Sequence, residues 1–394
     1  MFGKKEFKVT GIKPSELERL VYVVSNALII PTKEHKKILE HLRDYGLSSL
    51  RAIRDGNKII GGLQILNWGL YFGGRGIPAA GISVVGIAPE YRRVGAASTL
   101  MAETVRELYD QGVEISALFP ANIPLYRKSG YEIAMEWCKI ILKLRDIPLR
   151  NMDLDIVRYK GKNTKDLENV YRRFASATNG NIDRTRFEWK NIIHSRWGPK
   201  RVVYLIKRGK DVEGYVILPE DVEERTTTIY DCCVLSRDAT ERLITFLADY
   251  STMVEKAKFY GSRTDPLLQL IPNSAYEFKE MMYCMLRIVS VPKALAARGY
   301  PVGLEAEIHL EVEDNIIKQN SGRYVLKVKD GAGSVRKGGD GKVKIDVRSL
   351  AQLFSGFLSP MELRLGGTIE GSDGDLERLA PIFAGPRPWI RDMF

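Results

Sequence analysis

Cysteine is scarce in this chain, which has only four among its 394 residues: Cys138, Cys232, Cys233 and Cys284. So few cysteines cannot build a disulfide framework in a chain of this length, and no CxxC pair or His/Cys spacing indicates a structural zinc. We therefore expect no metal and a reducing, cytoplasmic setting.

Long apolar runs are missing as well. No stretch reaches the roughly 18 residues of a membrane span, and the start MFGKKEFKVT carries charges where a signal peptide has its apolar segment. With 44% hydrophobic and 28% charged residues, the chain has an ordinary globular composition. We exclude the membrane, secreted, collagenous and disordered classes, and the length predicts two or three domains.

The chain carries a net positive charge of +11, from 60 Lys and Arg residues and 49 Asp and Glu residues. Such a surplus suits a polyanionic partner, either a nucleic acid or a phosphorylated cofactor. The basic residues are dispersed, with no Arg-rich tract, zinc finger or RNP-type signature. This pattern counts against a nucleic acid, and a modest surplus on a chain of this length is often only a solvated surface.

The chain contains an internal similarity between residues 53–65, IRDGNKIIGGLQI, and residues 206–218, IKRGKDVEGYVIL. Each segment predicts a β-hairpin with a polar turn containing Gly, and each second strand begins with a Gly that permits a bulge or a close approach. In the alignment of the two segments, Ile53 matches Ile206 and Gly61 matches Gly214. Two unrelated hairpins would also look alike over a dozen residues.

After each hairpin the sequence predicts a strand followed by a helix. In the first copy the strand covers 82–88, and apolar residues then recur at helical spacing before a C-capping Gly112: Ala97, Leu100, Met101, Val105 and Leu108. The second copy, 226–251, has no glycine between its strand and helix. The second copy therefore keeps the strand-and-helix scaffold and lacks the function that the glycine has in the first copy.

From about residue 287 the pattern changes to short alternating strands followed by a helix around 349–358, which predicts a third, α+β domain. Its glycine-rich stretches at 331–333 and 338–341 are interpreted as hairpin turns. We expect domains at 1–148, 149–288 and 289–394.

The sharpest motif is the stretch Arg92, Arg93, Val94, Gly95, Ala96, Ala97 at a strand-to-helix junction. The N-terminus of a helix offers unpaired N–H groups and a partial positive charge to a pyrophosphate, and Gly95 allows close approach of the backbone. The stretch is neither a Walker A loop nor a GxGxxG fingerprint. By itself, a simple helix-capping loop explains it as well.

The order of motifs resembles the GNAT acetyltransferase family. The family pattern Arg/Gln-x-x-Gly-x-Gly/Ala, which binds the pyrophosphate of acetyl-CoA, is matched by Arg92, Gly95 and Ala97. Its downstream Asn-x-x-x-Tyr-x-x-x-Gly-aromatic is matched by the residues Asn122, Tyr126, Gly130 and Tyr131. The whole chain, with its ending FAGPRPWIRDMF, is similar to the Eis (enhanced intracellular survival) N-acetyltransferases. This implies two tandem GNAT folds, each a mixed sheet with flanking helices, followed by a sterol carrier protein-like α+β domain.

The resemblance implies an enzyme that uses acetyl-CoA as co-substrate and acetylates amines of aminoglycosides, lysine side chains or peptides. It implies that the strand at 84–88 splays from its neighbour and offers the backbone of Val85, Gly86 and Ile87 to the pantetheine amides. It places Asn122 beside the cofactor. It also implies a hexamer, which the residues themselves do not show.

The resemblance further assigns the catalytic groups. Tyr126 matches the general acid for the leaving thiolate, and an ordinary tyrosine pKa of about 10 keeps it protonated at pH 7. By composition alone, a packed aromatic is the better interpretation. None of the four histidines is well placed as a base, and Eis-like proteins use the terminal carboxylate, here on Phe394. An α-carboxyl group, with an ordinary pKa of about 3.3 to 3.7, is ionised at pH 7.

The acceptor site departs from the Eis pattern. Asn26 stands where these proteins commonly have an acidic residue, and Met393 stands where a carboxylate would help. Both departures count against broad polycation binding. Phe119 and Trp197 are candidate apolar walls of the acceptor site, and a simple core role explains each of them as well. The alternatives are a GNAT protein or peptide N-acetyltransferase of other specificity, and a non-catalytic lipid-binding or scaffold protein.

Overall fold

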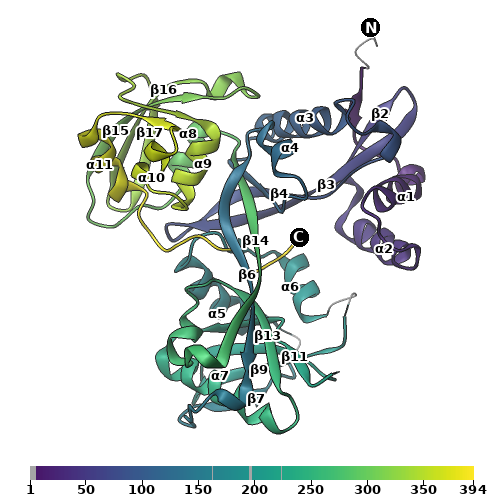
Figure 1. Ribbon diagram of the computed structural model, residues 1–394, viewed down its shortest axis with the longest axis vertical. Helices are drawn as coiled ribbons and strands as arrows, with labels where there is room; N and C mark the ends of the chain where they lie inside the picture. The colour runs from purple at the N-terminus through teal and green to yellow at the C-terminus, as the bar shows by residue number, and fades with distance from the viewer. Residues whose placement is uncertain (1–5, 162, 195–197, 223) are drawn as a thin grey trace. The chain divides into compact units, whose positions relative to one another are not determined.

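The computed structural model describes residues 6–161, 163–194, 198–222 and 224–394 (Figure 1). Contacts group the chain into two compact units. The first comprises Met1–Met135, Cys284–Gly385 and Met393–Phe394, and the second comprises Glu136–Tyr283 and Pro386–Asp392. The C-terminal domain therefore shares a unit with the first domain. The boundaries at 148 and 288 stay predictions.

A mixed sheet forms the N-terminal part of the first unit, with the strand order β1-β2-β3-β4-β5-β14. The bounds are β1 (Lys8–Thr10), β2 (Leu50–Asp55), β3 (Lys58–Phe72), β4 (Arg75–Ile87), β5 (Ile115–Leu118) and β14 (Tyr276–Ile288), of which the last residues pair with β5. Neighbouring strands are antiparallel except β4 and β5, which are parallel.

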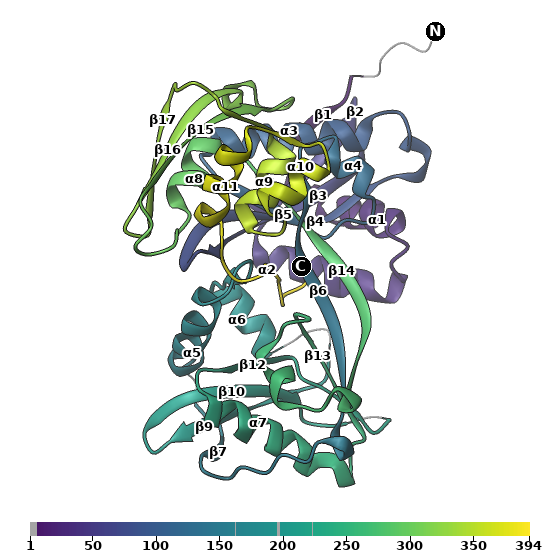
Figure 2. The same cartoon turned by 60° about the vertical axis from the view of Figure 1, so that its left-hand side comes forward.

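Helices cover both faces of this sheet (Figures 1 and 2). They are α1 (Leu17–Ala27), α2 (His35–Tyr45), α3 (Ala96–Asp110) and α4 (Ile123–Arg127). Ala52 packs in the cluster of α1, and its neighbour Ile53 packs in the cluster of α3. Because successive side chains of a strand point to opposite faces, the two helices lie on opposite sides. The predicted apolar stripe of α3 is confirmed, with Leu100, Met101, Val105 and Leu108 fully buried.

Both predicted hairpins are present: β2 with β3, and β9 (Arg201–Arg208) with β10 (Asp211–Pro219). Ile53 pairs with Gly61 in the first hairpin, and Ile206 pairs with Gly214 in the second. The pairing register shifts directly before each of these glycines, so each hairpin carries a bulge at the same place. This shared irregularity supports a true repeat over a chance likeness.

The second unit is built from the remaining strands and helices of the middle of the chain. One sheet has the order β12-β10-β9-β7, with β7 (Asp155–Arg158) and β12 (Asp231–Val234) at its edges. The later part of β6 (Glu132–Lys143) pairs with β13 (Lys256–Gly261), which pairs with β11 (Thr226–Thr228). The other elements are β8 (Ile182–Asp183), α5 (Lys165–Ser176), α6 (Arg186–Ile193) and α7 (Arg237–Asp249).

The C-terminal domain is α+β, as predicted. Its sheet has the order β17-β16-β15-β18-β19, with β15 (Ala306–Glu313), β16 (Gly322–Lys329), β17 (Ala332–Lys337), β18 (Val343–Asp346) and β19 (Ile369–Glu370). The helices are α8 (Val291–Ala297), α9 (Val347–Ser355), α10 (Pro360–Leu365) and α11 (Asp373–Ile382).

The two glycine-rich stretches of this domain differ. Gly331 lies in the tight turn of the β16–β17 hairpin, as predicted. The prediction of a hairpin turn for 338–341 is wrong, because β18 pairs parallel to β15 rather than with β17. Gly338, Gly339 and Gly341 have positive φ in a connection that returns the chain past two strands.

Among the residues that the structure describes, we find no helix both long and apolar enough to cross a bilayer. All four cysteines are buried and free.

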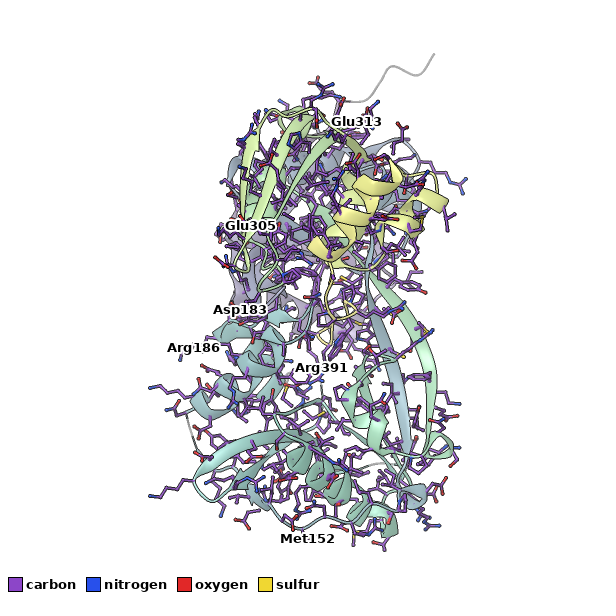
Figure 3. The ribbon with its side chains drawn as sticks, turned by 90° about the vertical axis from the view of Figure 1, so that its left-hand side faces the viewer. Met152, Asp183, Arg186, Glu305, Glu313 and Arg391 are labelled. Atoms are coloured by element: carbon purple, nitrogen blue, oxygen red, sulfur yellow. The ribbon has the colours of Figure 1, made fainter. Side chains whose placement is uncertain are left out.

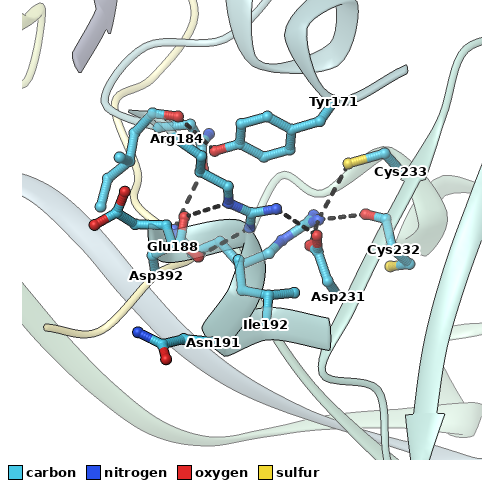
Figure 4. A network of polar contacts seen from close by, with 12 residues as sticks. Tyr171, Arg184, Glu188, Asn191, Ile192, Asp231, Cys232, Cys233 and Asp392 are labelled. Carbon is cyan, nitrogen blue, oxygen red and sulfur yellow. Dashed lines mark hydrogen bonds and ion pairs between the residues drawn. The ribbon is translucent and has the colours of Figure 1, made fainter. Parts of the chain in front are cut away.

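The tail segment Pro386–Asp392 is held in the second unit by ion pairs around a buried carboxylate (Figure 4). Arg184 Nη1 lies 2.5 Å from Asp231 Oδ2, and Arg391 Nη1 lies 2.9 Å from Asp231 Oδ1. Arg184 also contacts Asp392 at 2.8 Å, and the hydroxyl of Tyr215 donates to Asp231 at 2.6 Å. Burial by itself raises the pKa of Asp231, but the two guanidinium groups outweigh it and hold the pKa below its ordinary value.

Replacing Asp231 by Asn is expected to lower the free energy of unfolding by about 3 to 5 kcal/mol, because two buried arginines lose their shared counter-charge. Urea unfolding of the full chain measures this. The control is Asp238→Asn, whose half-exposed carboxylate pairs with Arg208 and should contribute less than about 1 kcal/mol. Equal effects of the two changes would contradict the structural role of Asp231.

The Asp231 contribution should also depend on pH. The pKa of Asp231 is lower in the folded state than in the unfolded chain, where it is about 3.9. Its carboxylate therefore stabilises the fold fully when the pH is above the unfolded-state pKa, and this stabilisation is lost as the pH falls below that pKa. We therefore expect the stability difference between the wild type and Asp231→Asn to shrink from about pH 5 to about pH 2. A difference that stays constant over this range would show that the charge is not what stabilises.

Candidate active site

Strand β4 leaves its neighbour β5 part way along its length. The β4–β5 pairing covers Ala79–Gly81, whereas β4 stays paired with β3 as far as Ile87. A β-bulge lies between these two points, where the β3–β4 register shifts and Val84 has φ +56°. Of the predicted cofactor-binding residues, Val85 lies within the bulge, and Gly86 and Ile87 follow it. All three lie on strand edge beyond the last pair with β5. An edge of this kind can pair with an extended ligand.

The predicted phosphate loop forms the turn from β4 into α3. Gly95 is the N-cap with φ +92°, and no side chain caps the first turn of the helix. A Cβ built on Gly95 meets no atom of the described residues within 4 Å. The first N–H groups of α3 thus face open space at the positively polarised end of the helix. A pyrophosphate fits such a helix start.

The side chains of this loop divide into two groups. Arg92, Arg93 and Val94 are exposed, whereas Ala96 is buried under the start of α3 and Ala97 is half-buried. Arg92 Nη2 donates to the carbonyl of Ala27 at the end of α1, at 2.9 Å. Arg92 therefore joins the loop to α1 through this hydrogen bond, and it also adds positive charge beside the loop.

Asn122 and Tyr126 lie on α4. Asn122 is the N-cap, and its Oδ1 accepts a hydrogen bond from Leu125 N–H at 3.1 Å. Tyr126 is 5% exposed and packs in the core cluster of α3. Burial raises the pKa of Tyr126 to about 12, so the hydroxyl stays protonated at neutral pH.

Three residues near this site were not found from the sequence: Ser116, Arg287 and Trp68. Ser116 Oγ bonds the hydroxyl of Tyr131 at 2.8 Å and donates to the carbonyl of Ala80 at 2.7 Å, which joins β5 to β4 close to the place where they separate. A serine in an apolar strand is too common to single this one out.

Gly130 of the matched motif makes room for Arg287. A Cβ on Gly130 would lie 2.6 Å from Arg287 Nη1, and Gly130 has φ +82°. Arg287 is completely buried and pairs with Asp314 at 2.5 Å. An arginine inside the apolar run MLRIV is a signal of a buried ion pair that the sequence does offer.

The chain's last residue packs at the mouth of the separated strands. The Phe394 ring lies 5.0 Å from that of Trp68 and 5.4 Å from that of Phe119, both edge to face. Gly81, the last β4 residue paired with β5, faces both rings: a Cβ there would lie 2.3 Å from Trp68 and 3.0 Å from Phe394. Phe119 directly follows β5. The ring of Phe394 is thereby packed beside the β4–β5 opening.

The other expected acceptor residues are less defined. Asn26 is exposed near the end of α1, and Met393 is 54% exposed. Trp197 lies outside the described residues. The structure therefore brings Phe119, Trp68 and Phe394 together and leaves Asn26 on the surface.

The second copy differs at the corresponding helix start. Helix α7 follows β12 as α3 follows β4, but its N-cap is Ser236, whose Oγ accepts the N–H of Ala239 at 3.1 Å. A side-chain oxygen thus occupies a helix N–H group that the first copy leaves open. That the second copy lacks a phosphate site stays a prediction.

Comparison with known families assigns all three regions of the chain. An acetyltransferase (GNAT) domain matches residues 9–134, a second acetyltransferase (GNAT) domain matches residues 180–288, and a sterol carrier protein domain matches residues 291–391.

Whole-chain relatives agree. An uncharacterized N-acetyltransferase of Streptomyces griseus is 24% identical over 98% of this chain and 99% of its own length. N-acetyltransferase Eis of Mycobacterium tuberculosis is 26% identical over 79% of each chain. The crystal structure of a GCN5-related N-acetyltransferase from Anabaena variabilis is 34% identical, covers 99% of this chain and 100% of that one, and superposes with a TM-score of 0.94. With two acetyltransferase folds, a sterol carrier protein domain and these relatives, the chain belongs to the GCN5-related N-acetyltransferase family and is an acetyl-transferring enzyme related to Eis.

Proposed function

We propose that the first GNAT domain transfers the acetyl group of acetyl-CoA to a primary amine of an aminoglycoside-like or lysine-containing acceptor. The separation of β4 from β5 is the observation that supports this most strongly, because it leaves strand edge beside an uncapped helix start. Among the residues that the structure describes, the first copy combines the strand edge with an open N-cap glycine, whereas the helix of the second copy begins at Ser236.

Two parts of the site are proposed to hold acetyl-CoA. The backbone of Val85–Ile87 pairs with the pantetheine amides, as an added strand would. The residues 92–97 hold the pyrophosphate through backbone N–H groups and the charge of Arg93, with Asn122 alongside. Gly95 fits this role because the space above it is open.

In the proposed reaction the acceptor nitrogen attacks the thioester carbonyl, so that a C–N bond forms and the C–S bond breaks. The terminal carboxylate of Phe394 takes the proton of the amine, and Tyr126 gives its proton to the departing sulfur. The backbone N–H groups beyond the bulge stabilise the oxyanion. The packing of Phe394 against Trp68 and Phe119 supports a fixed terminus rather than a frayed one.

Acceptor choice is tested by incubating the enzyme and acetyl-CoA with kanamycin or with a lysine peptide blocked at both ends, and by measuring CoA thiol release. The same peptide with an acetylated lysine is the control. Release with kanamycin, or with both amines, supports the proposal, whereas release with the peptide alone favours the protein N-acetyltransferase alternative. Tight acetyl-CoA binding with no release on any amine would favour the lipid-binding or scaffold alternative and contradict the proposal.

We also propose that the enzyme assembles as a homo-hexamer, on its similarity to Eis proteins. Sedimentation equilibrium of the full chain tests the assembly. A monomer at micromolar concentration would contradict it.

Gly95→Asp should weaken acetyl-CoA binding at least tenfold, about 1.4 kcal/mol, because it adds negative charge at the helix start and a side chain at positive φ. Isothermal calorimetry measures the affinity. The matched control is Arg106→Glu, which changes charge on an exposed position of the same helix away from its start. Unchanged affinity of a folded Gly95→Asp protein would move the pyrophosphate elsewhere.

Tyr126→Phe should lower kcat by about 10² to 10⁴ and leave the Kd for acetyl-CoA nearly unchanged, because the proton is needed only in the transition state. With the pKa of Tyr126 raised to about 12, loss of its proton should not reduce kcat below about pH 11. Pre-steady-state and pH–rate measurements check both points. A Phe variant with full kcat in a chemistry-limited regime would return Tyr126 to a packing role.

Converting the terminal carboxylate to an amide by semisynthesis should abolish most acetyl transfer, while acetyl-CoA affinity and thermal stability stay close to wild type. The amide keeps the Phe394 ring packed and removes only the base. The same semisynthesis ending in the natural carboxylate is the control. Full activity of the amidated enzyme would exclude the terminus as base.

A further inference from the structure

The second unit contains a cavity of about 660 Å³. Its wall is formed by the end of α5, the junction of β12 and α7, the segment 265–270 and Arg391 of the tail. Figure 3 labels Arg391. The volume is within the usual range of small-molecule sites. By chain order, this is where the second copy has its counterpart of the β4–α3 junction, and no catalytic residue of the first domain lines the cavity.

Most of the wall is apolar. Its apolar side chains include Phe174 of α5, Val234 at the end of β12, Leu235, and Leu267 and Leu270 of the segment 265–270. A nucleotide is a poor occupant, because Ser236 already caps the helix that would hold a pyrophosphate. The wall suits an aliphatic or aromatic body instead.

Positively charged side chains outnumber negatively charged ones in the cavity wall. They are three arginines, Arg173, Arg237 and Arg391, and one aspartate, Asp265. Arg173 and Arg237 are exposed at the rim, and Arg237 pairs with Glu241 through one nitrogen at 2.8 Å. Asp231 pairs with Arg391 and Glu241 pairs with Arg237, so Arg173 is the guanidinium group of the wall that makes no ion pair with the described residues. Its positive charge attracts an anion and repels an amine ligand.

The inner polar groups are incompletely satisfied. Arg391 is 7% exposed, and its Nη1 pairs with Asp231 while its Nε makes no hydrogen bond. Asp265 is 2% exposed; its Oδ1 accepts the N–H of Leu267 at 3.0 Å and its Oδ2 has no partner. Burial raises the pKa of Asp265, and the charge of Arg391 opposes part of that rise. Buried groups without partners in a cavity wall point to a missing ligand or water.

We propose that this cavity binds a small amphipathic carboxylate, with its aliphatic body against the apolar wall and its carboxylate among the arginines. The second GNAT domain is then a binding domain for a ligand other than acetyl-CoA. This inference does not depend on the catalytic assignment in the first domain.

The test uses octanoate as probe, titrated into the full-length protein by calorimetry, with octylamine as the probe of opposite charge and equal length. Octanoate should bind with one site in this cavity, and octylamine should bind at least tenfold more weakly. Absence of octanoate binding, or equal binding of both probes, would overturn the proposal.

Two pairs of variants locate the site. Ala177→Trp fills the cavity and should abolish octanoate binding, whereas Ala306→Trp, at a separate cavity of the sterol carrier protein domain, should not. Arg173→Glu should weaken binding at least tenfold, and Arg172→Glu, its exposed neighbour outside the cavity wall, should have little effect.

If Ala177→Trp fails to fold, the variants Arg173→Glu and Arg172→Glu still show whether octanoate binds in this cavity. Octanoate binding that survives Arg173→Glu, or that is lost in Ala306→Trp instead, would place the ligand elsewhere and overturn the proposal.

Discussion

The loss of pairing between β4 and β5 after Gly81 is the constraint on which the rest of the first domain depends. Two parallel strands that stay paired offer no backbone to a ligand, whereas two that separate leave N–H and C=O groups to be satisfied by something else. The bulge at Val84 turns β4 away while its other edge keeps its ladder with β3. The open helix start of α3 follows the separated end of β4, and the ring of Phe394 packs against Gly81, where the two strands separate.

The repeated fold allows a comparison within one molecule. Both copies have the same hairpin with a bulge at the same place, and both place a strand before a helix. They differ in the residue that begins the helix: Gly95 leaves the first turn open, and Ser236 uses its own oxygen to close it. One N-cap residue thus separates a helix start that suits a phosphate from one that does not. The second copy has instead an apolar cavity edged by arginines, which is chemistry for a different kind of ligand.

Features set by local sequence were predictable. The hairpin glycines, the apolar stripe of α3 and Gly95 at the strand–helix junction follow from turn geometry and helical spacing, and the structure has all of them. Features that need distant residues were not. The packing of Trp68 on Phe394 joins residues more than three hundred positions apart, and the fit of Arg287 over Gly130 depends on β14 returning beside the first domain's own sheet. The prediction for the loop at 338–341 is wrong because nothing in the local sequence distinguishes a hairpin turn from a connection that passes two strands.

The most direct measurement is the stoichiometry of acetyl-CoA binding to the full-length chain, determined by calorimetric titration against a known concentration of folded protein. If the open helix start decides where the cofactor binds, one molecule binds per chain although the chain has two GNAT folds. Two equivalents per chain would show that the Ser236 cap does not close the second site. No binding at all would show that the opening between β4 and β5 is not a cofactor site.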